Sequence, residues 1–208
     1  MSVSITVGAY GVAFGAAAVA NGFTVVQACL LSLLTFSGAS QFAVIGVVGA
    51  GGSAISAIAT ASLLGVRNAL YGVIMAPHLK VKGLKRVVAA QVTIDESTGV
   101  ALGQVPRGID AMRKGFWYTG IGVFVFWNLF TLAGALGAQA MGDIRAFGLD
   151  SAVPAAFLGL VWPRLTGNFE RTLAVGCALF AIAMTPILPA GLPIIATAFI
   201  AVVVGLKR

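Results

Sequence analysis

Charge is what this sequence has least of. Only 9% of its residues are charged, whereas about a quarter are charged in an ordinary soluble domain. The first charged side chain is Arg67, so 66 residues pass before one occurs. A chain with so few charges cannot cover a folded surface in water, and a soluble globular protein is therefore excluded.

Histidine and cysteine are also scarce. His78 is the only histidine, which excludes a metal site built from several histidines and the metalloprotease motif H-E-x-x-H. Cys29 and Cys177 each lie inside an apolar run, where we expect a small buried side chain rather than half of a disulfide or metal pair. The nucleotide-binding loop G-x-x-x-x-G-K-[ST] does not occur. We therefore expect no metal, no cofactor and no enzymatic activity in this chain.

Hydrophobic residues, in contrast, make up 59% of the chain and gather in long runs. One membrane crossing needs about 20 apolar residues, which leaves room for about six to eight hydrophobic helical segments and short loops. Helices are expected because an unpaired strand cannot satisfy its backbone in lipid. The sequence predicts an all-α polytopic membrane protein with a single transmembrane domain over residues 1–208. The runs are 3–20, 24–50, 54–79, 87–105, 115–141, 151–162, 172–188 and 192–206.

Two of these runs carry polar residues at their centres, and we expect both helices to be broken or kinked there. The interruptions are Ser-Gly-Ala-Ser-Gln at 37–41 and Asp-Glu-Ser-Thr at 95–98. Irregular backbone at this depth is tolerated only where it lines a cavity or lies inside the protein. A third break is expected between 172 and 206, because one helix of that length would measure about 52 Å against a bilayer core of about 30 Å. The residues that would cause it are Pro186, Pro189, Gly191 and Pro193.

The net charge of +7 is concentrated in loops. Basic residues cluster at 80–86, at 107–114 and at the C-terminal Lys207 and Arg208, which is typical of cytoplasmic loops and argues against nucleic-acid binding. If both internal clusters are cytoplasmic, the segment between them is a re-entrant hairpin; otherwise one cluster violates the positive-inside rule. A second hairpin at 24–50, entering from the opposite face, would form an inverted pair common in transporters. The loop at 141–150 would then lie outside, and both termini in the cytoplasm.

Arg67 lies at the centre of the run 54–79, where an unpaired guanidinium costs about 2.5–3.5 kcal/mol on insertion scales. Asp95 and Glu96 are similarly central in their own run, so we expect Arg67 within about 4 Å of one of them or in a shared wet cavity. We interpret the three residues as buried charges for ion coupling. A purely structural ion pair is one alternative. A surface-lying segment 87–105, which would leave Arg67 without a partner, is another.

The interruption at 37–41 is also a candidate substrate site. An unwound turn exposes main-chain amides and carbonyls, and a helix N-terminus favours the anionic end of a zwitterion. Close packing of small residues is the alternative interpretation of the same sequence. Asn68 and Tyr71 are added to the candidates because they are polar groups at comparable depth. The substrate-binding candidates are Ser37, Gly38, Ser40, Gln41, Asn68 and Tyr71.

Glycine spacing and the lone histidine allow two readings each. The pairs Gly11/Gly15 and Gly99/Gly103 have the G-x-x-x-G spacing of closely packed membrane helices, although glycine is common in such helices anyway. His78 could relay protons, but its place at the end of a run indicates an interfacial residue.

A series of short motifs runs along the chain: Phe14-Gly15, Ser37-Gly38-Ala39-Ser40-Gln41-Phe42, Arg67-Asn68, Leu70-Tyr71-Gly72, Ala76-Pro77-His78-Leu79, Asp95-Glu96-Ser97 and the ten residues 148–157. In this order and spacing they resemble the large subunit of the AzlC-type branched-chain amino acid exporters, over nearly the full length. The resemblance implies a multi-pass carrier of the bacterial inner membrane that exports Val, Leu, Ile or their analogues. It also implies a second, smaller subunit with four membrane spans.

The functional hypothesis is therefore secondary-active export of branched-chain amino acids, driven by an ion gradient. The amino acid would bind near the midplane, with its charged ends at the unwound backbone and Asp95 or Glu96 as the titratable site. A structural or channel-forming membrane subunit is the alternative, followed by an intramembrane enzyme. A channel would differ from a carrier by conducting without saturation or exchange.

Overall fold

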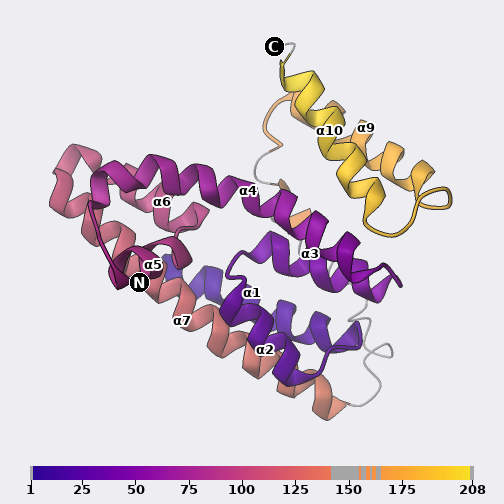
Figure 1. Cartoon of the computed structure of the whole chain (residues 1–208), viewed down its shortest axis with the longest axis horizontal. Coiled ribbons are helices and arrows are strands. Elements are labelled where there is room, and N and C mark those ends of the chain that lie inside the picture. The colour runs from indigo at the N-terminus through magenta and orange to yellow at the C-terminus, as the bar shows by residue number, and fades with distance from the viewer. Residues whose placement is uncertain (1, 142–154, 156–157, 160, 163–164, 207–208) are drawn as a thin grey trace.

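The computed structural model describes residues 2–141, 155, 158–159, 161–162 and 165–206, and every regular element in these ranges is a helix (Figure 1). The predicted all-α class is thereby confirmed. Most of the predicted run 151–162 and of the loop 141–150 lies outside the described residues. The helices are α1 (Ser2–Ala20), α2 (Val25–Leu34), α3 (Gly38–Gly49), α4 (Ala54–Leu79), α5 (Leu84–Gln91), α6 (Asp95–Gly103), α7 (Ile109–Met141), α9 (Asn168–Met184) and α10 (Leu192–Leu206), with a 3-10 turn η1 (Val105–Arg107).

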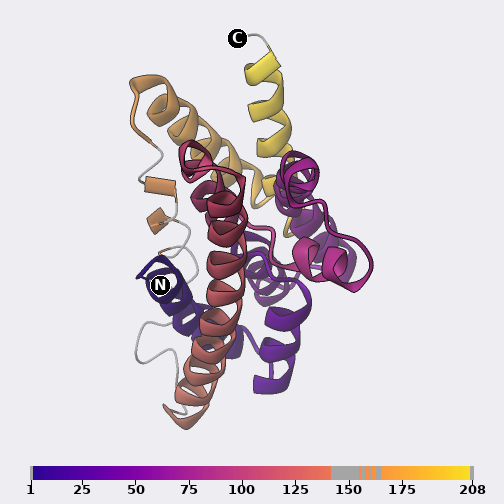
Figure 2. The same ribbon diagram turned by 90° about the vertical axis from the view of Figure 1, so that its left-hand side faces the viewer.

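Among the described residues, α1, α4 and α7 are the helices long and apolar enough to cross a membrane. They have 19, 26 and 33 residues, which at 1.5 Å per residue is about 28, 39 and 50 Å. A bilayer core is about 30 Å thick, so α7 extends beyond it. Figure 2 shows α7 as a long rod running through the helical body.

Helix α1 packs along α7 through glycines. A Cβ at Gly11 would collide with the carbonyl oxygen of Trp127, and one at Gly15 with that of Thr131. The G-x-x-x-G spacing on α1 thus permits close approach of two backbones, as small residues do in membranes. Gly99 and Gly103 of α6 have no such neighbours within 4 Å among the described residues, so the same spacing serves no close packing there.

The run 24–50 is broken, as predicted, but the break comes earlier than expected. Helix α2 ends at Leu34 and α3 begins at Gly38, so the polar residues at 38–41 form the first turn of α3 rather than the gap. The reason is that small and hydroxyl residues are favoured where a helix starts. The side chain of Gln41 turns back and donates from Nε2 to the carbonyls of Leu31 (3.4 Å) and Ser32 (3.2 Å). Both carbonyls lie in the last turn of α2, and that of Leu31 also accepts from the amide and the hydroxyl of Thr35, so Gln41 adds further hydrogen bonds at the break.

The run 87–105 is broken in the same way. Helix α5 ends at Gln91 and α6 begins at Asp95, so the expected break at 95–98 is again displaced by about one turn. Asp95 and Glu96 lie in the first turn of α6, where negative side chains oppose the positive end of the helix dipole. Ser97 Oγ donates to the carbonyl of Val92 at 2.8 Å and accepts from the amide of Ile94 at 3.0 Å, which folds the connection back on itself.

The two pairs of half-helices enter the bundle from opposite ends (Figure 1). The pair α2–α3 connects the end of α1 to the start of α4, and the pair α5–α6 connects the end of α4 to the start of α7. Arg113 Nε donates to the carbonyl of His78 at 2.9 Å, which holds the basic stretches 80–86 and 107–114 at one end of the molecule. The two predicted breaks are confirmed and the two pairs are oppositely directed, while their re-entry from a membrane face stays a prediction.

The C-terminal run is also interrupted where predicted. Helix α9 ends at Met184 and α10 begins at Leu192, so Pro186, Pro189 and Gly191 occupy the turn, while Pro193 lies in the first turn of α10. The two helices form a hairpin that projects from the rest of the bundle (Figure 1).

Candidate functional site

A cavity of about 270 Å³ lies where the two broken helices meet. Gln91 Nε2, at the end of α5, donates to the carbonyl of Leu33 near the end of α2 at 2.8 Å, so the two breaks are in direct contact. Residues of α1, α3, α4, α6 and α7 line the cavity. Since α1, α4 and α7 are the candidate spans, the cavity lies inside the spanning part of the fold.

One wall of the cavity is charged. Arg67 Nη1 lies 3.4 Å from Asp95 Oδ2, and the two side chains are 32% and 23% exposed. Glu96, next to Asp95, lines the same cavity. The predicted ion pair between α4 and α6 is confirmed. The alternative that segment 87–105 lies on the surface and leaves Arg67 without a partner is wrong.

Two helices begin at the cavity, and their N-termini differ. Asp95 and Glu96 give the start of α6 its own negative charges. The start of α3 carries no acidic residue, and its N-cap, Ser37, makes no capping hydrogen bond through its side chain. The first main-chain amides of α3 therefore have no acceptor within the helix, and Gly38 lines the cavity directly. Such an N-terminus attracts anions.

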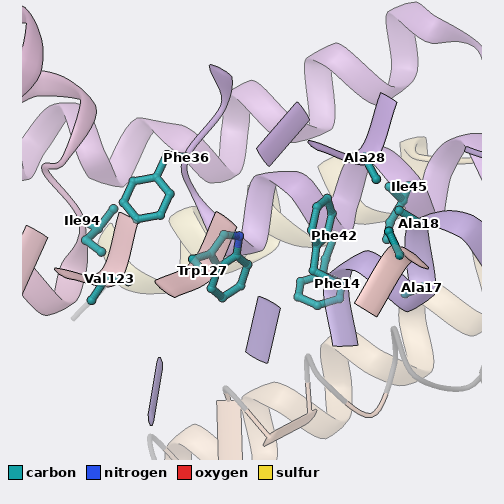
Figure 3. Packing of buried hydrophobic residues seen from close by; sticks show 11 residues of the cluster. Phe14, Ala17, Ala18, Ala28, Phe36, Phe42, Ile45, Ile94, Val123 and Trp127 are labelled. Atoms are coloured by element: carbon teal, nitrogen blue, oxygen red, sulfur yellow. The ribbon is translucent and has the colours of Figure 1, made fainter. Parts of the chain in front are cut away.

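The rest of the cavity lining is largely apolar and aromatic. Phe36 and Phe42 line the cavity and belong to the main hydrophobic core, shown in Figure 3. Phe42 packs edge-on against Phe14, with ring centroids 5.5 Å apart and an interplanar angle of 85°. Trp127 stacks on Phe14, with ring centroids 6.3 Å apart and an interplanar angle of 26°. Val7, Leu64 and Val123 extend this apolar surface.

Three residues that line the cavity carry buried polar atoms with no hydrogen-bond partner among the described residues. They are Arg67 (Nε), Asn68 (Oδ1) and Trp127 (Nε1). A buried polar atom left unpaired costs about 1–3 kcal/mol, and most such atoms in folded proteins are satisfied. Two donors and one acceptor thus lie unpaired in residues that surround the cavity.

The predicted site residues divide into two groups. Ser40, Gln41 and Tyr71 do not line the cavity. Ser40 Oγ donates to the carbonyl of Ala61 at 2.9 Å and so joins α3 to α4, while Gln41 is fully buried at the α2 break. Ser40 and Gln41 therefore hold the start of α3 in place without lining the cavity. The predicted residues that do line the cavity are Ser37, Gly38, Arg67, Asn68, Asp95 and Glu96.

Trp127 was missed by the sequence analysis, together with Phe36 and Phe42. One signal could have found Trp127: it lies near the middle of the run 115–141, whereas Trp117 and Tyr118 lie near its start. Aromatic residues of the interfacial belts gather at the ends of spans, so a central tryptophan has a different role.

The lone histidine and the two cysteines do not line the cavity. His78 is exposed at the end of α4 and does not line the cavity, which agrees with the interfacial interpretation. Cys29 and Cys177 are free and half-buried. Among the described residues, no group of three His, Cys, Asp or Glu side chains is arranged to hold a metal ion.

The fold and the cavity define a helical membrane protein whose broken helices surround a transporter-like site. The chain belongs to the AzlC family, whose model, described as AzlC protein, matches residues 2–141. It is similar to an uncharacterized membrane protein of Archaeoglobus fulgidus, with 32% identity over 80% of this chain and 73% of the relative. It is also similar to the inner membrane protein YgaZ of Escherichia coli, with 28% identity over 80% of this chain and 70% of the relative. No solved structure matches the chain significantly.

Proposed function

We propose that the protein is a secondary-active exporter of branched-chain amino acids in the bacterial inner membrane, driven by a proton gradient. The observation that carries the proposal is the cavity at the two helix breaks, which combines an ion pair and a further carboxylate with an apolar aromatic wall. An aliphatic amino acid has the same two parts, a zwitterionic head and an apolar side chain.

The size of the cavity supports a small substrate. Its volume of about 270 Å³ is just below the usual range of ligand pockets, about 300–1,000 Å³. A single amino acid suits such a space better than a peptide. Apolar pockets distinguish one methylene by only about 1–3 kcal/mol, so we expect Val, Leu and Ile to share the site.

The charges support exchange of a proton for the substrate. Arg67 pairs with Asp95, and we assign the neighbouring carboxyl group of Glu96, which hydrogen-bonds with Asp95, as the group that receives an ammonium group or a proton. If Glu96 holds either a proton or the substrate ammonium, but not both, protons entering from outside displace an amino acid that leaves the cell. This competition is sufficient to couple the two fluxes in opposite directions.

The test is counterflow in proteoliposomes. Vesicles loaded with unlabelled leucine should take up external labelled leucine transiently, with saturation, and excess valine or isoleucine should compete. A channel or purely structural subunit gives no saturable exchange, so linear, non-competed uptake would overturn the proposal in favour of that alternative.

We further propose a small partner subunit with four spans, and an orientation with both termini in the cytoplasm. The basic stretches gathered at one end of the molecule support the orientation under the positive-inside rule. The low burial of α4 supports the partner: 11% of its apolar window is buried, against 44% for α1. Counterflow with and without a co-expressed membrane protein of about 100 residues, enough for four spans, tests the partner.

A further inference from the structure

Six exposed cations form a basic surface at one end of the molecule. They are Lys80, Lys82, Lys85, Arg86, Arg107 and Lys114. They come from two separate stretches of the sequence, which the hydrogen bond from Arg113 to the carbonyl of His78 holds together. This end is at the left of Figure 1, where α4 ends, α5 follows and α7 begins.

The basic surface has almost no opposite charge of its own. Between residues 79 and 115, Asp110 is the only acidic residue apart from Asp95 and Glu96, which line the cavity. None of the six cations forms an ion pair with another described residue. The described part of the protein therefore leaves a strong excess of positive charge at this end.

The cations also lie where a helix disfavours them. Lys85 and Arg86 are in the first turn of α5, which has no acidic residue, and Arg107 lies just ahead of α7. The N-terminal end of a helix carries partial positive charge, so a cation placed there is repelled by the helix dipole. A bound anion would offset this repulsion at both helix starts.

Beside the cations, α5 turns an apolar face outward. The side chains of Leu84, Val87 and Val88 are 78%, 65% and 40% exposed, and their spacing places them on one face of the helix. Ala89, which is 5% exposed, lies on the other side and packs in a core cluster with Met112. The outer surface of α5 therefore offers apolar side chains directly next to the basic surface.

We propose that the basic surface and the outward face of α5 bind anionic phospholipids, with the lipid phosphate at the cations and an acyl chain along α5. A phospholipid has both a charged headgroup and an apolar chain, whereas a free phosphate or a nucleic acid matches the cations alone. The candidate spans α4 and α7 end and begin here, so the surface lies where lipid headgroups are. Clusters of about four to eight Lys and Arg beside a span are typical of anionic-lipid binding.

The bound lipid stabilises the hairpin formed by α5 and α6. Ala89 is the only residue of α5 that is buried, so this helix has few contacts of its own with the bundle. Helix α6 follows α5 after a short break, and its first residues, Asp95 and Glu96, line the cavity. A lipid held against α5 therefore helps to fix the position of the cavity's carboxyl groups.

The test is titration of the purified protein in detergent with dioleoyl phosphatidylglycerol, followed by native mass spectrometry. Dioleoyl phosphatidylcholine is the reference lipid, because it has the same chains and a phosphate but no net charge. We expect the wild type to bind phosphatidylglycerol about tenfold more tightly, and the double variant Lys85→Gln, Arg86→Gln to lose most of this preference. Equal binding of the two lipids by the wild type, or an unchanged preference in the variant, would overturn the proposal.

The double variant Lys207→Gln, Arg208→Gln is the matched control, because it removes the same charge at the C-terminus. It should keep the preference of the wild type, and an equal loss in both double variants would show that net charge rather than the basic surface selects the lipid. Val87→Ser should weaken the binding of both lipids alike, since it removes an apolar contact and no charge. Unchanged binding by Val87→Ser would contradict the place of the acyl chain on α5.

Competitors distinguish the possible sources of the phosphate. Glycerol 3-phosphate, which has a headgroup phosphate without chains, and a single-stranded oligonucleotide are each added to the phosphatidylglycerol complex of the wild type at the lipid's own concentration. We expect the lipid to stay bound. Displacement by glycerol 3-phosphate would assign the surface to a free anion, and displacement by the oligonucleotide to a nucleic acid, and either result would overturn the proposal. No amino acid takes part in these measurements, so their outcome is independent of the proposed function.

Discussion

Gln91 on α5 donates a hydrogen bond from Nε2 to the main-chain carbonyl of Leu33 on α2, 2.8 Å away. This bond connects two half-helix pairs that enter the bundle from opposite ends, at the depth where both helices are broken. The two hairpins are therefore in direct contact. The contact lies next to the cavity, because residues 94–96 and 36–39 line it from the two breaks.

Removing this bond should loosen the contact between the breaks. We expect Gln91→Ala to lower the free energy of unfolding by about 0.5–1.5 kcal/mol, the usual net value of one hydrogen bond. Thermal unfolding of the purified protein measures the change. Gln139→Ala, at an exposed position of α7, is the control and should be neutral. Equal effects of the two substitutions would argue that the cross-break bond contributes nothing.

The ion pair between Arg67 and Asp95 should show strong coupling between the two residues. Arg67→Ala or Asp95→Ala leaves one charge in the interior without its partner, which costs more than removing both. We therefore expect the double variant to be more abundant in the membrane than either single variant. Quantitative immunoblots of membrane fractions provide the measurement, and additive losses would show that the two side chains do not interact.

Substitution of Glu96 should abolish coupling to the proton gradient while leaving substrate exchange intact. We expect Glu96→Gln to keep leucine counterflow but to lose efflux driven by a pH gradient, because the amide cannot bind and release a proton. Asp95→Asn should impair the same step by releasing Arg67 from its partner. Asp110→Asn, at the start of α7 outside the cavity, is the control for a lost carboxylate. Normal gradient-driven efflux by Glu96→Gln would disprove the assignment of Glu96.

Gln41 should affect substrate binding indirectly, because its side chain stabilises the main chain at the break between α2 and α3. Gln41→Ala removes the side-chain donor to the carbonyl of Ser32 and one of the donors to that of Leu31, and we expect a loss of about 1–3 kcal/mol in stability together with weaker apparent affinity for leucine. Ser40→Ala should weaken the affinity less, since it removes one bond to α4. Thermal unfolding and competition binding measure both effects. An affinity loss without any stability loss would mean that Gln41 contacts the substrate.

The glycines of α1 should be far less replaceable than those of α6. Gly15→Ala places a Cβ against the Thr131 carbonyl and should separate α1 from α7, lowering the yield of folded protein. Gly99→Ala has the same sequence spacing but open space around it and should be neutral, or stabilising by up to about 1 kcal/mol through helix propensity. Size-exclusion chromatography of the two variants distinguishes these outcomes.

Much of this architecture could be predicted from the sequence because main-chain polar groups in lipid must be hydrogen-bonded within the protein, which favours helices. Apolar runs indicated the spanning helices, and the cost of a buried guanidinium indicated the partner of Arg67. The breaks were placed about one turn late, because residues such as Gly38 and Asp95 mark the start of the second half-helix rather than the gap before it.

The candidate site was harder to predict than the fold. Its composition depends on which face of each helix turns inward, and polar residues on one short segment can face opposite ways. Gly38 faces the cavity, whereas Gln41, three residues later, faces α2. Trp127 meets α3 only through the packing of α7, a contact that no local pattern along the chain encodes.

The most direct test of the central claim is uphill transport of leucine in proteoliposomes. Vesicles are prepared with equal concentrations of labelled leucine inside and outside, and the external pH is then lowered. A carrier that exchanges a proton for the amino acid should drive internal leucine below the external concentration, and a proton ionophore should abolish the effect. Internal leucine that remains equal to external leucine, in vesicles where counterflow proves the protein active, would contradict proton-driven export.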